Sequence, residues 1–453
     1  MFSRQPFLFI FGLSVYGFTM NVDTFFYFTR FNKMYEDSYN FFCRYIDGSI
    51  TLLDIQKKCM TGKLNPEIRC FIYKILLNIL PYNEPGSWKN VVEKQRNTYY
   101  SKLKELLSKN QYILEFINCH SIKGSSPYEK LFALLPEDNK ELLSLIKLDV
   151  LRTFQDLDLF LNNKIKELLT KILFVYSIDN PYPSYCQGMN EILGTLLLSF
   201  YPSLKYNKFS KDELDKENNG KITNKEMLYY FLEDEEFFEA DLFTIFCELM
   251  SRGLTVLYSY NDEKYRNANN TPVDTTNLTI ENLEKSGESL LMKRIKKIFF
   301  IYLKKDKEYF EVLSKNIEPN LFLLRWILCM LNREISLKNI FYVWDCVFFY
   351  EFMEFTFEES KNKLIEEREN SNNDGNNNIN RLNFLDYICL SMIFDLKKEI
   401  INSDVSIILS KFLKYPNERN IKKIMKEAFK YSYSFNEKKD FWNVETLKDV
   451  KLI

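Results

Sequence analysis

Turn-forming residues are scarce in this chain, and their scarcity limits the folds that it can adopt. The 453 residues include 12 glycines and 12 prolines, whereas average usage is about 7% glycine and 5% proline, roughly twice as many in total. Sandwiches and barrels need a turn about every 8–12 residues, and nucleotide-binding α/β folds need glycine-rich loops. The sequence therefore disfavours both classes and favours long helices.

Apolar residues recur with helical spacing along most of the chain. The segment from Glu67 to Leu80 is strongly apolar and stops at Pro81, where a helix is expected to end. The same pattern predicts helices over residues 88–108, 142–161, 165–176, 187–200, 241–257, 290–313, 321–331, 340–352, 384–400 and 405–412. No segment alternates convincingly between apolar and polar residues, so the predicted fold class is all-α.

Three polar segments interrupt the helical pattern, namely residues 205–225, 261–286 and 366–380. The last contains the asparagine tract NSNNDGNNNIN. Segments of this composition bury too little apolar area to offset the loss of chain entropy. We therefore expect three disordered surface insertions.

The first 33 residues form a separate hydrophobic extension. Its apolar run, from Pro6 to Asn21, is followed by Asp23 and is shorter than the ~20 residues that span a bilayer. Four alternatives are open for this extension. It is a signal peptide, a membrane anchor, a helix of the core or non-native sequence upstream of Met34. We expect this extension to pack weakly, if at all, against the rest of the protein.

Charge, histidine and cysteine usage exclude several classes of function. The net charge of −1 gives no overall basic field that holds nucleic acid. His120 is the only histidine, which excludes catalysis by paired histidines and multi-histidine metal sites. A nucleophilic pair of Cys119 and His120 is disfavoured because adjacent residues lie on different sides of a helix. Nine scattered cysteines without a C-x-x-C pair predict a reduced, cytosolic protein.

Residues 215–226 have the spacing of a calcium-binding EF-hand loop. Oxygen donors occupy positions 1, 3, 5, 9 and 12, and Gly220 occupies position 6, where calcium's geometry requires a sharp turn. The donors are Asp215, Glu217, Asn219, Thr223 and Glu226. The alternative is a chance match, because the whole segment is rich in Asn, Lys and Glu.

Two short motifs carry the candidate chemistry, and each has a purely structural interpretation. Asp149 and Arg152 are three residues apart, so alone they predict a surface ion pair on a helix, worth ~0.2–0.5 kcal/mol. Ser184 and Gln187 alone predict a capping box, with Gln187 bonding to the backbone. Gly188 would then lie inside a helix at a cost of ~1 kcal/mol relative to alanine.

Taken together, I-x-x-D-x-x-R-T and, 35 residues later, Y-x-Q-G-M-N resemble the two signature motifs of the TBC domain, a family of GTPase-activating proteins for Rab GTPases. The resemblance covers about residues 60–430, between a leading helical segment at 34–59 and a tail at 431–453. Gln155 stands where the family often has proline. Downstream the family's pattern continues in order with Glu318-Pro319, Leu324-Arg325-Trp326, Arg333-Glu334, Val343-Trp344-Asp345, Asp386-Tyr387-Ile388 and Tyr415-Pro416.

The resemblance implies a two-lobed domain of about sixteen helices and a role for each motif residue. Arg152 is expected to be an arginine finger and Gln187 a glutamine finger, both supplied in trans to the GTPase. Asp149 is expected to orient Arg152, while Tyr185 and Gly188 shape the loop that presents Gln187. The resemblance gives Trp344 and Asp345 structural roles. It leaves Arg325 either supporting the helix of Arg152 or pairing on the surface.

The function implied by the resemblance is regulation of vesicle traffic through GTP hydrolysis by a GTP-bound Rab. The chain would then be a cytoplasmic protein, peripheral to endomembranes, and not an enzyme on its own. GTP and magnesium would belong to the GTPase, and the chain would carry no cofactor. A silent TBC-fold adaptor for Rab or coat proteins is the alternative from another class, and a helical scaffold with chance motifs is a third. Retention of both Arg152 and Gln187 favours the activator.

Overall fold

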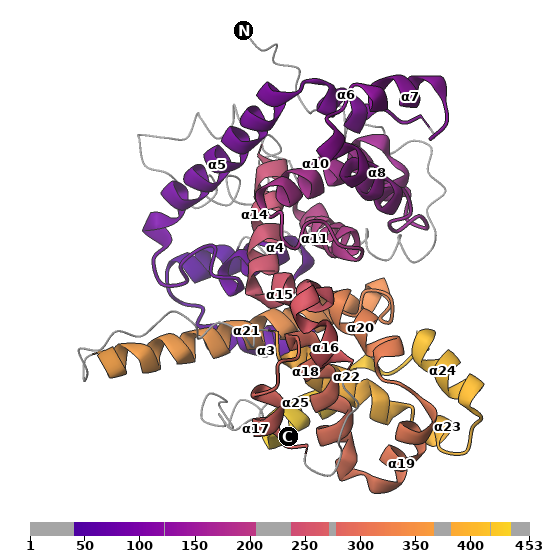
Figure 1. The fold of residues 1–453 in the computed structure, drawn as a ribbon. Coiled ribbons are helices and arrows are strands. Elements are labelled where there is room, and N and C mark those ends of the chain that lie inside the picture. Colours follow the sequence, from indigo (N-terminus) through magenta and orange to yellow (C-terminus); the bar gives the residue numbers. More distant parts are fainter. Residues whose placement is uncertain are drawn as a thin grey trace. The chain divides into compact units, whose positions relative to one another are not determined.

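The computed structural model describes residues 40–121, 123–204, 237–270, 278–366, 382–416 and 418–435. Within these ranges the regular structure is helical and contains no strand, which confirms the predicted all-α class (Figure 1). The extension at 1–33, the calcium-loop candidate at 215–226 and the tract at 367–380 lie outside the described residues. None of the described helices is long and apolar enough to cross a membrane.

The described residues form two compact units, as the two-lobed expectation requires. The first unit contains the residues up to Ile55 and Lys63–Glu248. The second contains Gln56–Gly62 and the residues from Leu249 onward. The helix α3 (Leu52–Thr61) passes from the first unit into the second.

The first unit is built around α10 (Asn163–Asp179) and α11 (Met189–Leu204), which pack against each other. The helix α8 (Glu137–Leu151) packs against both, and α11 also packs against α4 (Arg69–Leu76). Figure 1 shows α8, α10 and α11 side by side. The remaining helices are η2 (Pro66–Ile68), η3 (Pro85–Ser87), α5 (Trp88–Lys109), α6 (Tyr112–Asn118), α7 (Ser126–Ala133), α9 (Asp158–Leu161) and α14 (Phe238–Leu249), preceded by a helix over residues 40–46.

A buried ion cluster joins α4, α5 and α14 in this unit. Nζ of Lys74 lies 2.9 Å from Oδ2 of Asp241, and Nε of Arg96 lies 2.8 Å from Oδ1. The side chains of Lys74 and Arg96 are each 3% exposed, and that of Asp241 is 10% exposed. Burial raises the pKa of Asp241, but the two cations outweigh this effect and hold the pKa below its ordinary value. Removal of the Asp241 carboxylate would therefore take from Lys74 and Arg96 the buried counter-charge that they share.

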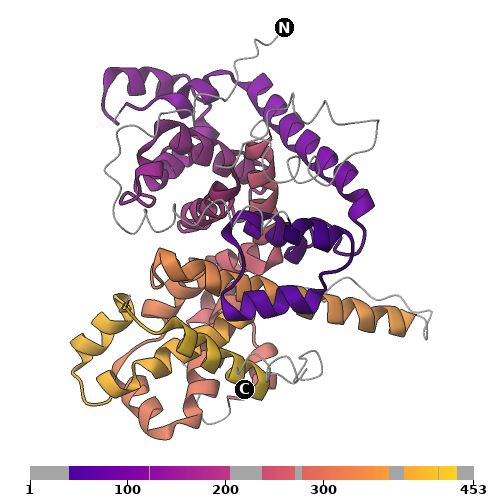
Figure 2. The same cartoon turned by 180° about the vertical axis from the view of Figure 1, so that it is seen from behind.

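The second unit is organised around α22 (Phe384–Asp395), which packs against α20 (Asn320–Leu328), α21 (Leu337–Glu366) and α25 (Ile421–Phe435). Figure 2, the view from behind, shows the yellow helices of this unit lying against the orange ones. Its other elements are η4 (Met250–Leu254), α15 (Thr255–Tyr258), η5 (Ser259–Asn261), η6 (Glu263–Tyr265), α16 (Arg266–Asn269), α17 (Ile280–Glu284), α18 (Leu290–Lys296), η7 (Lys297–Tyr302), η8 (Leu303–Lys305), α19 (Lys307–Asn316), α23 (Lys397–Ile400) and α24 (Val405–Leu413).

Buried charges hold the backbone where the chain enters α22. Nε of Arg294 donates to Oδ1 of Asp386 at 2.7 Å, and its Nη2 donates to the carbonyl of Leu382 at 2.8 Å. The N–H of Leu382 donates to Oε2 of Glu351 at 2.7 Å. Both backbone groups of Leu382 are thus fixed by charged side chains from other helices.

Two predicted helices are shorter than expected. The helix predicted over residues 142–161 ends at Leu151, and the chain then turns through Phe154, which has φ 43°. The helix predicted over residues 290–313 is divided into α18, η7, η8 and α19, and Asp306 caps the last of these by accepting from the N–H of Tyr309. With such interruptions, the described ranges contain more α-helices than the expected number of about sixteen.

The expectation of a disordered insertion over residues 261–286 is wrong for its described part. Residues 266–269 form α16 and residues 280–284 form α17. Thr279 caps α17 and Leu283 is 2% exposed. The side chain of Asn269 bonds both to the carbonyl of Tyr260 at 2.8 Å and to the N–H of Ser289 at 2.9 Å. A single buried leucine and these local bonds therefore order a segment whose composition is polar.

Candidate functional site

Arg152 directly follows the last residue of α8. Its φ of −101° and ψ of 2° depart from helical values, and its N–H donates to the carbonyl of Asp149 at 3.2 Å. The side chain is 55% exposed. The charge of a guanidinium at this position is favoured by the partial negative charge of a helix C-terminus. The fold thus holds an exposed arginine at a defined helix end.

The carboxylate of Asp149 pairs with the guanidinium of Arg152. Its Oδ1 lies 2.5 Å from Nη2 of Arg152, and its Oδ2 accepts a hydrogen bond from the hydroxyl of Tyr185 at 2.8 Å. The Asp149 side chain is 2% exposed. The interpretation as an ordinary surface ion pair is therefore wrong, because one partner is buried and bonded to a second segment of the chain.

Gln187 lies in a turn that leads into α11. The N–H of Met189 donates to the carbonyl of Cys186 at 3.2 Å and closes the turn. Gly188 occupies its third position with φ 108°, the position at which a type II turn requires a positive φ and favours glycine. The Gln187 side chain is exposed and has no hydrogen-bond partner among the described residues.

The capping-box interpretation is wrong because α11 begins at Met189, five residues after Ser184. The carbonyl of Gly188 accepts from the N–H groups of Glu191 and Ile192, both at 3.1 Å. Gly188 therefore precedes the helix, and its conformation, not a position inside the helix, explains the glycine. The Gln187 side chain is left free for another role.

Asn190 joins the turn of Gln187 to the end of α8. Its Oδ1 accepts from the N–H of Gly188 at 3.1 Å, and its Nδ2 donates to Oγ1 of Thr153 at 2.8 Å. The same Nδ2 lies 3.3 Å from the carbonyl oxygen of Asp149. Asn190 is 2% exposed. Sequence reasoning quoted this residue as part of the second motif but gave it no role. The sequence signal that could have identified Asn190 is its place in Y-x-Q-G-M-N. Its partners Thr153 and Asp149 belong to the other motif.

Tyr185 completes the connection between the two motifs. Its side chain is buried at 6% exposure, and its hydroxyl lies 2.8 Å from Asp149 and 3.1 Å from Oδ1 of Asn190. Burial, followed by the neighbouring carboxylate of Asp149, raises its pKa well above the ordinary value. The hydroxyl therefore stays protonated and remains a hydrogen-bond donor at any physiological pH.

The other residues singled out by the sequence have structural contacts. Arg325 donates to Oε1 of Glu334 and to the carbonyl of Leu413, both at 2.8 Å. Glu334 is 1% exposed, so Arg325 is not a simple surface partner. Trp344 is fully buried and donates to the carbonyl of Met330 at 3.1 Å. Asp345 is 1% exposed.

Alternative chemistries find little support in the described residues. Nε2 of His120 lies 2.8 Å from Oε1 of Glu167, so the imidazole has a carboxylate partner. None of the nine cysteines, all of which the structure describes, forms a disulfide. Among the described residues, no group of three or more His, Cys, Asp or Glu side chains is placed to hold a metal ion.

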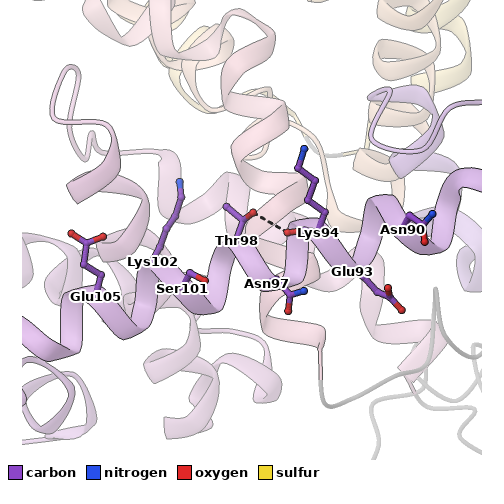
Figure 3. A pocket seen from close by; sticks show the side chains of 8 residues that line it. All are labelled: Asn90, Glu93, Lys94, Asn97, Thr98, Ser101, Lys102 and Glu105. Carbon is purple, nitrogen blue, oxygen red and sulfur yellow. Dashed lines mark hydrogen bonds between the residues drawn. The ribbon is translucent and has the colours of Figure 1, made fainter.

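A shallow depression runs along α5 (Figure 3). Every residue lining it comes from that one helix, and all are polar, including Lys94, Thr98 and Glu105. Thr98 donates to the carbonyl of Lys94 at 2.8 Å, a bond within the helix. These side chains form a solvated helix face and do not converge on a ligand.

The site presents two different polar groups on a common support. Arg152 offers a planar cation that suits phosphate oxygens, and Gln187 offers an amide that both donates and accepts hydrogen bonds. Both side chains are exposed, while Asp149, Tyr185 and Asn190 beneath them are buried. Such an arrangement is suited to chemistry on a second molecule that docks against this surface.

Comparisons with known proteins place the site in a family context. The model of the Rab-GTPase-TBC domain matches residues 66–359. TBC1 domain family member 5 of Homo sapiens is 25% identical over 378 residues, which cover 81% of this chain and 41% of that protein. Its homolog A in Dictyostelium discoideum is 24% identical over 370 residues, covering 68% of this chain and 28% of that protein. The chain thus spans well under half the length of these relatives.

A solved structure shares the fold. The crystal structure of the Ypt/Rab-GAP domain of Gyp1p superposes with a TM-score of 0.52 at 15% sequence identity. The match covers 85% of this chain and 94% of that domain.

Proposed function

The chain belongs to the Rab-GTPase-TBC domain family, and from this premise we propose that it activates GTP hydrolysis by a Rab GTPase in its GTP-bound form. In this proposal the chain does not bind GTP alone. It completes the active site of the GTPase, which brings its own GTP and magnesium.

Each exposed side chain has a task in the proposed reaction. Arg152 neutralises the negative charge that spreads over the transferring phosphoryl group. An arginine supplied in trans accelerates hydrolysis by about 10³–10⁵ in the well-known Ras case. Gln187 holds the attacking water in line with the bond that breaks. Asp149 limits the orientations of Arg152, so that less side-chain entropy is lost when the guanidinium meets the phosphate.

One observation carries this proposal more than any other: the hydrogen bonds of Asn190. They tie the turn of Gln187 to the end of α8, so the two exposed groups share a rigid base. Catalysis by electrostatic stabilisation needs donors that are held in place before the reaction begins. An adaptor that only binds has no need to support an arginine and a glutamine in this way, and this favours the activator over the silent alternative.

The proposed activity sets where the protein acts. Rab GTPases carry GTP on the cytoplasmic face of endomembranes, as the family resemblance implies. We therefore propose a cytoplasmic protein, peripheral to endomembranes, whose action regulates vesicle traffic by ending the GTP-bound state of its Rab.

The test is a panel of purified Rab proteins loaded with GTP. Phosphate release is followed with the full chain, with Arg152→Ala and with Gln187→Ala. We expect acceleration of one or a few members by the full chain and a large loss with either variant. Binding to a GTP-loaded Rab without any acceleration would identify an adaptor instead.

A further inference from the structure

Three leucines on α8 point into solvent beside the proposed catalytic arginine. Leu145 is 47% exposed, Leu148 is 52% exposed and Leu151 is 49% exposed. They follow one another at intervals of three residues and so lie on adjoining turns of one side of the helix. Leu143, Ile146 and Val150 on the opposite side are buried at no more than 2% exposure. We call Leu145, Leu148 and Leu151 the leucine stripe.

Arg152 extends from the same side of the helix as the stripe. At 100° per residue, position 152 falls about 20° from position 145 and about 40° from position 148. Arg152 directly follows the last residue of α8, so the helical residues before it set the position of its Cα. The exposed cation and the exposed leucines therefore lie on the same side of α8.

Leu145 and Arg152 are also close to each other along the helix axis. Seven residues separate Leu145 from Arg152, a rise of roughly 10 Å. A specific interface covers about 800 Å² on each partner, which corresponds to a disc of roughly 16 Å radius. A GTPase seated so that Arg152 reaches its nucleotide must therefore also cover the leucine stripe.

We infer that the leucine stripe is a docking surface for the GTPase itself. This inference rests on the proposed function and deepens it by separating affinity from catalysis. The partner that it predicts carries exposed apolar side chains beside its nucleotide site, because burial of the leucines against charged groups would be unfavourable. The stripe sets how tightly the GTPase is held, while Arg152 and Gln187 set how fast the bound GTP is hydrolysed.

The test is the double variant Leu145→Gln with Leu148→Gln. Glutamine is a good helix former, and both positions are about half exposed, so the fold should persist with an unchanged melting temperature. The matched control is Leu321→Gln, a leucine of α20 in the other unit that is 53% exposed. The dissociation constant is measured by titration with a responsive Rab that carries a non-hydrolysable GTP analogue. KM and kcat are measured with the same Rab carrying GTP as the substrate.

We expect the double variant to raise both the dissociation constant and KM about tenfold or more, which is the size of effect that anchor residues at interfaces produce. We expect kcat to be unchanged and Leu321→Gln to behave like the wild type. An unchanged dissociation constant, with normal acceleration by the wild type, would overturn the inference alone. If the leucine stripe instead mediates self-association, the wild type should form a dimer that the double variant does not form. The double variant would then keep the KM of the wild type, and this result would also overturn the inference.

The proposed function and this inference fail in different ways. A wild-type chain that binds a Rab without acceleration overturns the activator proposal, but the dissociation constants still test the stripe. A wild-type chain that binds no member of the panel overturns both.

Discussion

Nδ2 of Asn190, in the first turn of α11, lies 2.8 Å from Oγ1 of Thr153, just beyond the end of α8. Thr153 in turn donates to the carbonyl of Asp149 at 2.8 Å. The two exposed residues that we assign to catalysis are therefore not independent. A change at this buried contact should alter the positions of both.

Asn190→Ala should reduce acceleration of GTP hydrolysis at least about tenfold. The substitution leaves the N–H of Gly188 without its acceptor and the hydroxyl of Thr153 without its donor, at about 1–3 kcal/mol of stability. The decisive measurement is a double-mutant cycle in the Gln187→Ala background. Residues that act through one another give effects that do not add, so Asn190→Ala should cost less there than in the wild type.

The control for this cycle is Asn162→Ala. Asn162 caps α10 by accepting from the N–H of Lys164 at 2.9 Å, and loss of such a cap costs a comparable ~1 kcal/mol. It should lower the melting temperature and leave the acceleration unchanged. Equal losses of activity in the two variants would show that Asn190 acts only through stability.

Arg152→Ala should abolish acceleration, and Arg152→Lys should fail almost as completely, because a point charge does not replace the planar fork of a guanidinium. The melting temperature should change little, since Arg152 is half exposed and Asp149 keeps its hydrogen bond from Tyr185 when the guanidinium is removed. Arg266→Ala is the matched control, because Arg266 is 68% exposed and lies 3.7 Å from Glu263, also three residues away. Activation retained by either Arg152 variant would contradict the assignment.

Gln187→Ala should cut the activated rate about a hundredfold or more, the usual effect of removing one positioned polar group from a reacting centre. Its melting temperature should match the wild type, because the side chain caps nothing. Gln155→Ala provides the control, since Gln155 is also exposed and bonds only to the carbonyl of Leu151 at 2.8 Å. A lowered melting temperature with normal acceleration would restore a structural role for Gln187.

Gly188→Ala should destabilise the protein by ~1–3 kcal/mol and also impair activation. An alanine at φ 108° is strained, and relief of that strain would rotate the peptide that carries Gln187. Gly124→Ala imposes a similar strain at φ 91° in a loop where nothing lies within 4 Å of the new Cβ. Calorimetry should find both variants destabilised, whereas phosphate release should fall only for Gly188→Ala.

Asp241→Asn should destabilise the first unit by ~3–5 kcal/mol at neutral pH, because Lys74 and Arg96 then lose the buried carboxylate with which both pair. The pKa of Asp241 is lowered in the folded protein, so its contribution is full above the unfolded pKa of about 3.9. That contribution is lost as the pH falls from there through the lower folded pKa. Melting curves of both proteins should therefore converge only below about pH 4. A constant difference down to pH 2 would contradict the assignment.

Much of the helical framework follows from local sequence. The prediction over residues 88–108 agrees closely with α5 (Trp88–Lys109), because its pattern is long and regular. Predictions failed where the chain leaves a helix for reasons outside the pattern. Phe154 adopts φ 43°, and its aromatic ring packs against that of Phe160 at 5.1 Å. That contact is not visible in the periodicity of the segment.

The sequence names candidate site residues but does not show how they are connected. The order of the two motifs identified Arg152, Gln187, Asp149, Tyr185 and Gly188 as candidates. The burial of Asp149 and the role of Asn190 depend on contacts between segments about 40 residues apart, 41 for Asn190 with Asp149. Spacing within one helix cannot reveal which side of it meets another.

The hydrogen bonds that Arg294 and Glu351 make with the backbone of Leu382 have a consequence for the genetics of this chain. The asparagine-rich tract NSNNDGNNNIN precedes Leu382 in the sequence. Because Arg294 and Glu351 fix both backbone groups of Leu382, the starting point of α22 is set by its own contacts and not by the number of residues before it. In general, doubling the length of a connection between two ordered elements costs only ~0.6 kcal/mol. Alleles with longer or shorter tracts between α21 and α22 should therefore encode the same domain, and length polymorphism should accumulate there under little selection.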